Sequence, residues 1–104
     1  MRVKEFFEKE KLKHFTEERP EGFEALPEVK EEAHRIQFFT NGKRWLFNSS
    51  KRCKKLLALA ETAARMMEEK GEVREEELLS LFKEERDGKK MEERAKLVLR
   101  ALKK

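Results

Sequence analysis

The stretch Ile36–Phe47, IQFFTNGKRWLF, decides the fold of the middle of the chain. Its Asn41-Gly42 dipeptide favours a tight two-residue turn between two β-strands. The register that closes this turn brings four large apolar side chains to one face of the hairpin, as the pairs Phe38 with Trp45 and Ile36 with Phe47. The alternative is a helix that begins at Pro27 and ends at a cap formed by Asn41 and Gly42.

The segments on either side of this stretch show the periodicity of amphipathic helices. The predicted helices cover residues 3–18, 50–70, 75–83 and 90–103, and a further short helix precedes the hairpin. Ser49 or Ser50 is expected to cap helix 50–70, and Gly71 to end it. The predicted fold class is mainly α, a small bundle of four to five helices with one β-hairpin at 35–47, or all-α in the alternative.

The 104 residues are expected to form a single domain. Its parts are an N-terminal helix and linker (1–33), a basic hairpin (34–48) and a C-terminal three-helix core (49–104). The single cysteine, Cys53, excludes an intramolecular disulfide and a multi-cysteine zinc site, and we expect it to be buried in the core. No spacing of histidines, serines or carboxylates marks a catalytic centre, so we expect no enzyme activity, no cofactor and no metal.

Composition indicates the cellular localisation and the source of the protein. No apolar run approaches the ~20 residues that a membrane span needs, and no signal peptide is recognisable. We therefore expect a cytoplasmic protein that does not bind membranes. Charged residues make up 46% of the chain while Asn and Gln are rare, a pattern typical of thermophilic proteins.

Positive charge is concentrated in the middle of the chain. Between Ala33 and Ala60 there is no Asp or Glu, while there are seven Lys or Arg residues. Four of these bases fall at the expected start of helix 50–70: Lys51, Arg52, Lys54 and Lys55. A helix N-terminus favours acids, so a basic first turn is unfavourable for folding alone. We interpret this run as the contact for an anion, and a nucleic-acid phosphate is the first candidate.

The candidate nucleic-acid-binding residues form three groups. The first is the hairpin tip, whose tryptophan either offers a stacking face to an unpaired base or packs in the core. The second is the start of helix 50–70, where backbone N–H groups add to the side chains. The third is the outer face of the last helix. In chain order these residues are Lys43, Arg44, Trp45, Ser49, Ser50, Lys51, Arg52, Lys54, Lys55, Lys89, Lys90, Lys96 and Arg100.

Two segments suggest a role for the last helix. MMEEKGEVREEELLSLF (66–82) and KKMEERAKLVLRALKK (89–104) belong to a helix–turn–helix–helix pattern over residues 56–103. This pattern resembles the trihelical core of helix-turn-helix and winged-helix DNA-binding domains. The resemblance implies that the last helix enters the major groove, where its bases meet phosphates or guanine edges. A plain three-helix bundle has the same pattern of helices.

These observations predict a nucleic-acid-binding protein. The basic hairpin and helix start, residues 34–55, would contact phosphates, and the last helix would be a second contact. DNA and RNA, single- or double-stranded, are all open as partners, because the prediction depends on phosphate charge. The alternative is a small helical adaptor that docks on an acidic partner protein through the same patch.

Overall fold

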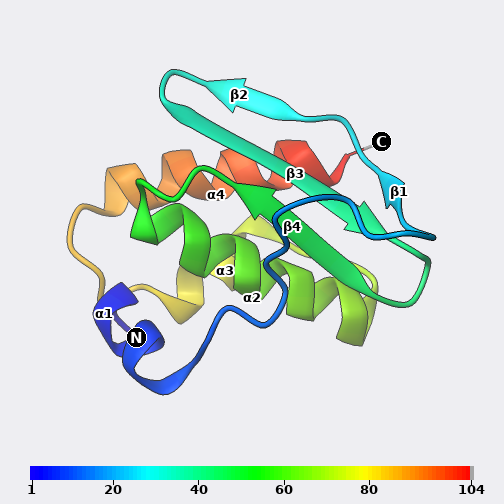
Figure 1. Ribbon diagram of the computed structural model, residues 1–104. Helices are drawn as coiled ribbons and strands as arrows, with labels where there is room; N and C mark the ends of the chain where they lie inside the picture. The colour runs from blue at the N-terminus through cyan, green and yellow to red at the C-terminus, as the bar shows by residue number, and fades with distance from the viewer. Residues whose placement is uncertain (104) are drawn as a thin grey trace.

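The structure, a computed structural model, describes residues 1–103 and has an α+β fold (Figure 1). In chain order its elements are α1 (Val3–Lys9), β1 (Glu24–Ala25), β2 (Val29–Glu31), β3 (His34–Thr40), β4 (Trp45–Ser49), α2 (Lys54–Lys70), α3 (Glu75–Leu81) and α4 (Gly88–Leu102). The strands form one four-stranded antiparallel sheet, and α2 and α4 cover one of its faces. The prediction of a mainly α bundle is therefore wrong, and so is its all-α alternative.

The centre of the sheet is β3. While β4 pairs along one of its edges, β1 and β2 share the other: β1 places Ala25 beside Phe39, and β2 places Val29 beside Ile36. The short helix predicted before the hairpin is thus a strand. Its Glu, Lys and Ala residues favour helices in isolation, but pairing with the longer strand β3 overrides that local preference. Glu32, with a φ of 54°, lies in the tight turn between β2 and β3.

The predicted hairpin over residues 35–47 is present as β3 and β4, in a register that differs by two residues. Phe38 pairs with Phe47 instead of Trp45, and Trp45 pairs with Thr40. A shift of two residues preserves the alternation of faces, so Ile36, Phe38 and Phe47 still point into the core between the sheet and the helices. The individual pairs predicted from the sequence are wrong, whereas the predicted buried face is correct.

A loop of residues 41–44 replaces the predicted two-residue turn. The Oδ1 of Asn41 accepts hydrogen bonds from the backbone N–H groups of Lys43 (3.0 Å) and Arg44 (2.7 Å). Gly42 has a φ of 93°, whereas Asn41 does not take the positive φ that the predicted turn requires. The Asn41 side chain thus organises a longer loop, as asparagine side chains often do in turns.

The core lies between the sheet and the helices. Its largest fully buried apolar side chains come from β3, β4 and all three C-terminal helices; they are Ile36, Phe38, Phe47, Leu56, Leu59, Leu78, Phe82, Met91, Leu97 and Val98. Burial of one such side chain contributes about 1.5–3 kcal/mol. This apolar layer therefore holds α2 and α4 against the sheet and fixes where the ends of these helices lie.

The N-terminal helix is much shorter than the predicted helix 3–18. After α1 the chain runs extended beside β4, where the N–H of Thr16 donates to the carbonyl of Phe47 and the N–H of Phe47 donates to the carbonyl of His14, both at 2.8 Å. Phe15 has the spacing of a helical stripe in the sequence. It packs instead edge to face on Phe47, with ring centroids 5.5 Å apart, because this segment forms a parallel bridge to the sheet.

Among the C-terminal helices, the largest difference from the prediction is the start of α2. α2 begins at Lys54 and not at residue 50, because Ser49 is buried and Ser50 accepts a hydrogen bond from the N–H of Arg35 (3.3 Å), so neither serine caps it. Gly71, with a φ of 75°, ends α2 as predicted. α4 packs against β2 and β3 as well as against α2 and α3. Among the described residues, no helix has the length and apolar character to cross a membrane.

Candidate anion-binding site

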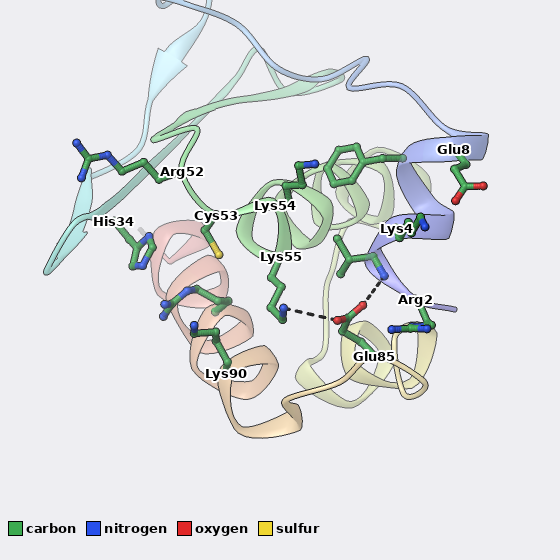
Figure 2. A pocket seen from close by; sticks show the side chains of 13 residues that line it. Arg2, Lys4, Glu8, His34, Arg52, Cys53, Lys54, Lys55, Glu85 and Lys90 are labelled. Atoms are coloured by element: carbon green, nitrogen blue, oxygen red, sulfur yellow. Dashed lines mark hydrogen bonds and ion pairs between the residues drawn. The ribbon is translucent and has the colours of Figure 1, made fainter.

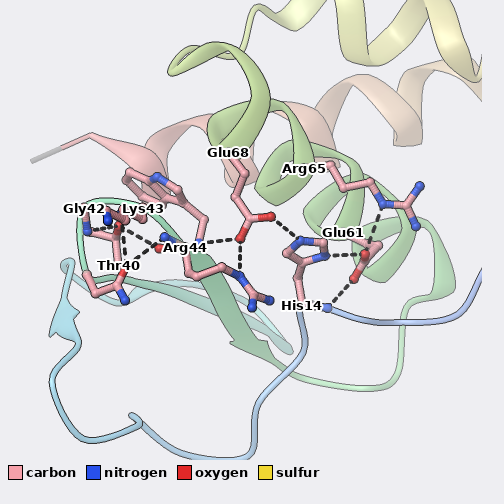
Figure 3. Close-up of polar contacts among 10 residues, drawn as sticks. His14, Thr40, Gly42, Lys43, Arg44, Glu61, Arg65 and Glu68 are labelled. Carbon is pink, nitrogen blue, oxygen red and sulfur yellow. Dashed lines mark hydrogen bonds and ion pairs between the residues drawn. The ribbon is translucent and has the colours of Figure 1, made fainter.

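The structure separates two basic groups that are neighbours in the sequence. The hairpin tip lies beside the C-terminal half of α2, where the Nε of Arg44 contacts the Oε2 of Glu68 at 2.8 Å (Figure 3). The first turn of this 17-residue helix is about 20 Å away along its axis. The hairpin tip and the helix start are therefore two separate surfaces.

The hairpin tip is held by a single carboxylate. Besides Arg44, Glu68 accepts hydrogen bonds from the backbone N–H of Trp45 (2.9 Å) and from the Nε2 of His14 (2.8 Å). Burial raises the pKa of Glu68, but the bonds from Trp45, His14 and Arg44 outweigh it and hold the pKa below its ordinary value. Trp45 is half-buried against the core, and Lys43 is exposed. Most of the polar groups at the tip are thus engaged in holding the fold.

Several other predicted residues face away from the start of α2. The Nζ of Lys51 contacts the Oε1 of Glu17 at 2.9 Å and lies over the ring of Phe15. Arg100 contacts Glu31 of β2 at 3.0 Å. Two further predicted bases of α4 are exposed and lie outside the pocket described next; they are Lys89 and Lys96.

The start of α2 opens onto a pocket of about 740 Å³ (Figure 2). The N-terminal end of α1, the start of β3 and the first half of α4 supply its other walls. Seven Lys and Arg side chains line the pocket, against two glutamates. The bases are Arg2, Lys4, Arg52, Lys54, Lys55, Lys90 and Arg94, and the acids are Glu8 and Glu85.

The pocket joins predicted site residues to residues that sequence reasoning missed. The predicted ones are Arg52, Lys54, Lys55 and Lys90. Arg94 belongs to the last helix, whose basic residues the helix-turn-helix resemblance assigns to nucleic acid, but it was not among the candidate site residues, although it follows Lys90 by one helical turn and this spacing indicates a shared face. Arg2 and Lys4 were missed because they lie in the acidic N-terminal third of the sequence. His34 gave no signal, since a lone histidine at the start of a strand has no distinctive spacing.

One of the two acids in the pocket is already engaged by the protein. The Oε1 of Glu85 accepts a hydrogen bond from the N–H of Val3 at 2.7 Å, and its Oε2 lies 3.5 Å from the Nζ of Lys55. Burial raises the pKa of Glu85, but the bond from Val3 and the charges of Lys55 and Arg2 outweigh burial and leave the pKa below its ordinary value. The pocket therefore keeps a large excess of positive charge after this carboxylate is counted.

Three residues that line the pocket each carry a buried nitrogen with no hydrogen-bond partner within residues 1–103. These atoms are the Nε of Arg2, the Nε of Arg94 and the Nδ1 of His34. A buried polar atom without a partner costs about 1–3 kcal/mol, so each of the three destabilises the wall of the pocket locally. Burial and the charges of Arg94 and Lys90 lower the pKa of His34 and outweigh two nearby glutamates. The ring is therefore neutral at neutral pH.

The backbone at the start of α2 adds further donors. Its first helical bond runs from the N–H of Leu57 to the carbonyl of Cys53 at 3.1 Å, which leaves the preceding N–H groups without a partner inside the helix. Cys53, the N-cap residue, makes no side-chain hydrogen bond to them. An uncapped helix start carries partial positive charge and binds anions.

Cationic side chains, unpartnered nitrogens and a helix start thus meet at one pocket, an arrangement that suits a group with several anionic oxygens. In the part of the chain that the structure describes, no three His, Cys, Asp or Glu side chains are placed to hold a metal ion. Comparison with known proteins found no matching protein-family model, and no significant match among curated proteins or solved structures.

Proposed function

We propose that the protein binds nucleic acid by contacting phosphates in the pocket at the start of α2. The observation that carries this proposal is the convergence of seven Lys and Arg side chains on an uncapped helix start. Such contacts neutralise phosphate charge and release counterions, and they supply affinity that does not depend on base sequence.

The basic side chains of the pocket fall into two groups, buried and exposed, that would contact different phosphates. The Arg94 side chain is 12% exposed, so it is held inside the pocket and would fix the position of a phosphate. Lys54 and Lys90 are exposed at the rim and would contact the phosphates that follow along the strand. Affinity at the rim is expected to depend more strongly on salt, because exposed charges are screened more than buried ones.

The alternative of an acidic protein partner would use the same pocket. Donors on several walls favour phosphate, because a phosphate group presents oxygens in several directions, whereas a carboxylate presents two in one plane. We therefore place nucleic acid first and treat a protein partner as an outcome of the test. A cytoplasmic, non-enzymatic role and a thermophilic source stay predictions from the sequence.

Two charge-reversed variants test the proposal directly. Lys54→Glu with Lys90→Glu reverses two rim charges, and Lys43→Glu with Lys89→Glu reverses two exposed charges outside the pocket. All four residues are nucleic-acid-binding candidates predicted from the sequence. Both double variants change the net charge by the same amount, so the variants differ only in the positions of the substituted residues. Lys89 and Lys90 are neighbours in α4, which matches the helical context closely.

Affinity is measured by fluorescence anisotropy with short single- and double-stranded DNA and RNA over a range of salt concentrations. The pocket variant should bind much more weakly than the control, and its slope of log affinity against log salt should be flatter by roughly 0.7–0.9 for each phosphate that the variant no longer neutralises. Equal effects of the two variants, or no binding to any of the four nucleic acids, would refute the proposal. Binding to acidic polypeptides alone would support the protein-partner alternative.

A further inference from the structure

The walls of the pocket restrict which phosphates can enter it. Arg2 comes from the N-terminal end of α1, His34 from the start of β3 and Arg94 from α4, so three separate elements surround the start of α2 (Figure 2). An internal phosphodiester continues into the chain on both sides and is best met by an open surface. A terminal phosphate projects beyond the last nucleotide and can enter a walled pocket first.

The number of donors also favours a terminal phosphate. A phosphomonoester carries a charge of about −1.5 to −2 near neutral pH and has three free acceptor oxygens, whereas a phosphodiester carries one charge and has two free oxygens. Seven Lys and Arg side chains line the pocket beside the uncapped start of α2, so the pocket matches the larger charge and the third free oxygen of a monoester. Charge-assisted bonds of this kind are also about twice as strong as neutral ones.

The size of the pocket and one aromatic wall indicate that more than a phosphate is bound. Its volume of about 740 Å³ lies within the ~300–1,000 Å³ typical of small-molecule sites. Phe7 lines the pocket and is half-buried. Its ring is fixed edge to face against Phe6, with centroids 5.3 Å apart, so the remaining surface is a rigid platform on which a base can stack.

On the basis of the proposed function, we infer that the pocket takes the phosphorylated end of a nucleic-acid strand. The terminal phosphate lies at the start of α2 among the basic side chains that line the pocket, and the terminal base stacks on Phe7. The recognised chemistry is that of a nucleoside monophosphate, which a free mononucleotide also has. The exposed lysines at the rim of the pocket favour a strand end over a free mononucleotide, because a mononucleotide has no further phosphates for these lysines to contact.

The test compares oligonucleotides of one sequence that differ only at the end: a 5′-phosphate, a 3′-phosphate, or hydroxyl groups at both ends. The unmodified protein should bind at least one phosphorylated form about tenfold or more tightly than the hydroxyl form. Equal affinity for all three forms overturns this inference and leaves the proposed function standing, whereas no binding to any form overturns both. A mononucleotide that binds as tightly as the phosphorylated strand overturns the assignment to strand ends.

Two variants locate the effect in the pocket. Arg94→Gln should abolish the preference for the phosphorylated end, because Arg94 is held inside the pocket. Lys96→Gln, which changes an exposed residue of the same helix outside the pocket, should retain it. Phe7→Leu should weaken binding of the phosphorylated strand by about tenfold and leave competition by inorganic phosphate unchanged. A preference that survives Arg94→Gln places the recognition elsewhere and overturns the inference, provided that circular dichroism shows each variant to be folded.

Discussion

Removal of the Glu61 carboxylate should be the most destabilising single change outside the apolar core. This side chain is fully buried in α2. Its Oε1 accepts the backbone N–H of His14 at 2.9 Å, and its Oε2 lies 2.6 Å from the Nδ1 of His14 and 3.3 Å from the Nε of Arg65 (Figure 3). The substitution Glu61→Ala leaves both donors of His14 buried without a partner, so the N-terminal segment loses its main polar attachment to the helix.

The magnitude follows from the number of donors left unpaired. Each hydrogen bond to a charged acceptor is worth about 1.5–3 kcal/mol, and breaking a buried charged contact costs about 3–5 kcal/mol. We expect Glu61→Ala to lower the free energy of unfolding by about 4 kcal/mol. Since a domain of this size has about 5–15 kcal/mol in total, the melting temperature should fall by roughly 15–30 °C.

Urea unfolding of the protein and two variants measures this effect. The control is Glu10→Ala, which removes another carboxylate contact of Arg65 (3.1 Å) from a side chain that is 37% exposed. An exposed contact of this kind contributes less than about 1 kcal/mol. The reasoning is refuted if Glu61→Ala costs no more than Glu10→Ala at an unchanged dependence on urea.

Three further changes test other parts of the structure. Gly42→Ala should cost about 1 kcal/mol in urea unfolding, because a φ of 93° is unfavourable for alanine and its Cβ would contact nothing within 4 Å. The pKa of His34 is lowered in the folded state, so its neutral form contributes stability that is present above the unfolded pKa of 6.5 and is lost as pH falls through the folded pKa. His34→Gln should therefore reduce the fall in unfolding free energy between about pH 7 and about pH 5, as measured by urea titration at both values. Lys51→Ala should change the melting temperature little, since its contact with Glu17 joins side chains that are 65% and 74% exposed and is worth less than about 1 kcal/mol.

Local sequence signals were sufficient where the structure depends on local chemistry. Gly71 ends α2 because a residue with positive φ is needed there, and alternation of apolar residues identified the buried face of β3 and β4. The same signals failed for β2, whose helix-favouring residues are strand only because β3 lies beside them. They failed also for Phe15, whose position is set by a bridge to Phe47, 32 residues later.

The candidate site was predictable only in part for the same reason. Arg52, Lys54 and Lys55 are close in sequence, so their charge was visible as a run. Arg2 and Arg94 lie far from that run and reach it only when α1 and α4 pack around the start of α2. The periodicity of a single helix or strand does not show which other elements pack beside it.

The part of the pocket that α1 forms can open locally while the rest of the protein stays folded. This helix has only seven residues and no side-chain cap, and it is held by the contact of Val3 with Glu85 and by Phe6, whose ring lies 5.8 Å from that of Phe82. Segments of this kind open locally at a lower free energy than the central elements, so the amides of α1 should exchange with solvent faster than those of α2. A bound anion that needs Arg2 can be held only in the closed form, and it would slow that exchange in proportion to its occupancy. Under the proposed function, anion binding and the local folding of α1 form one coupled equilibrium.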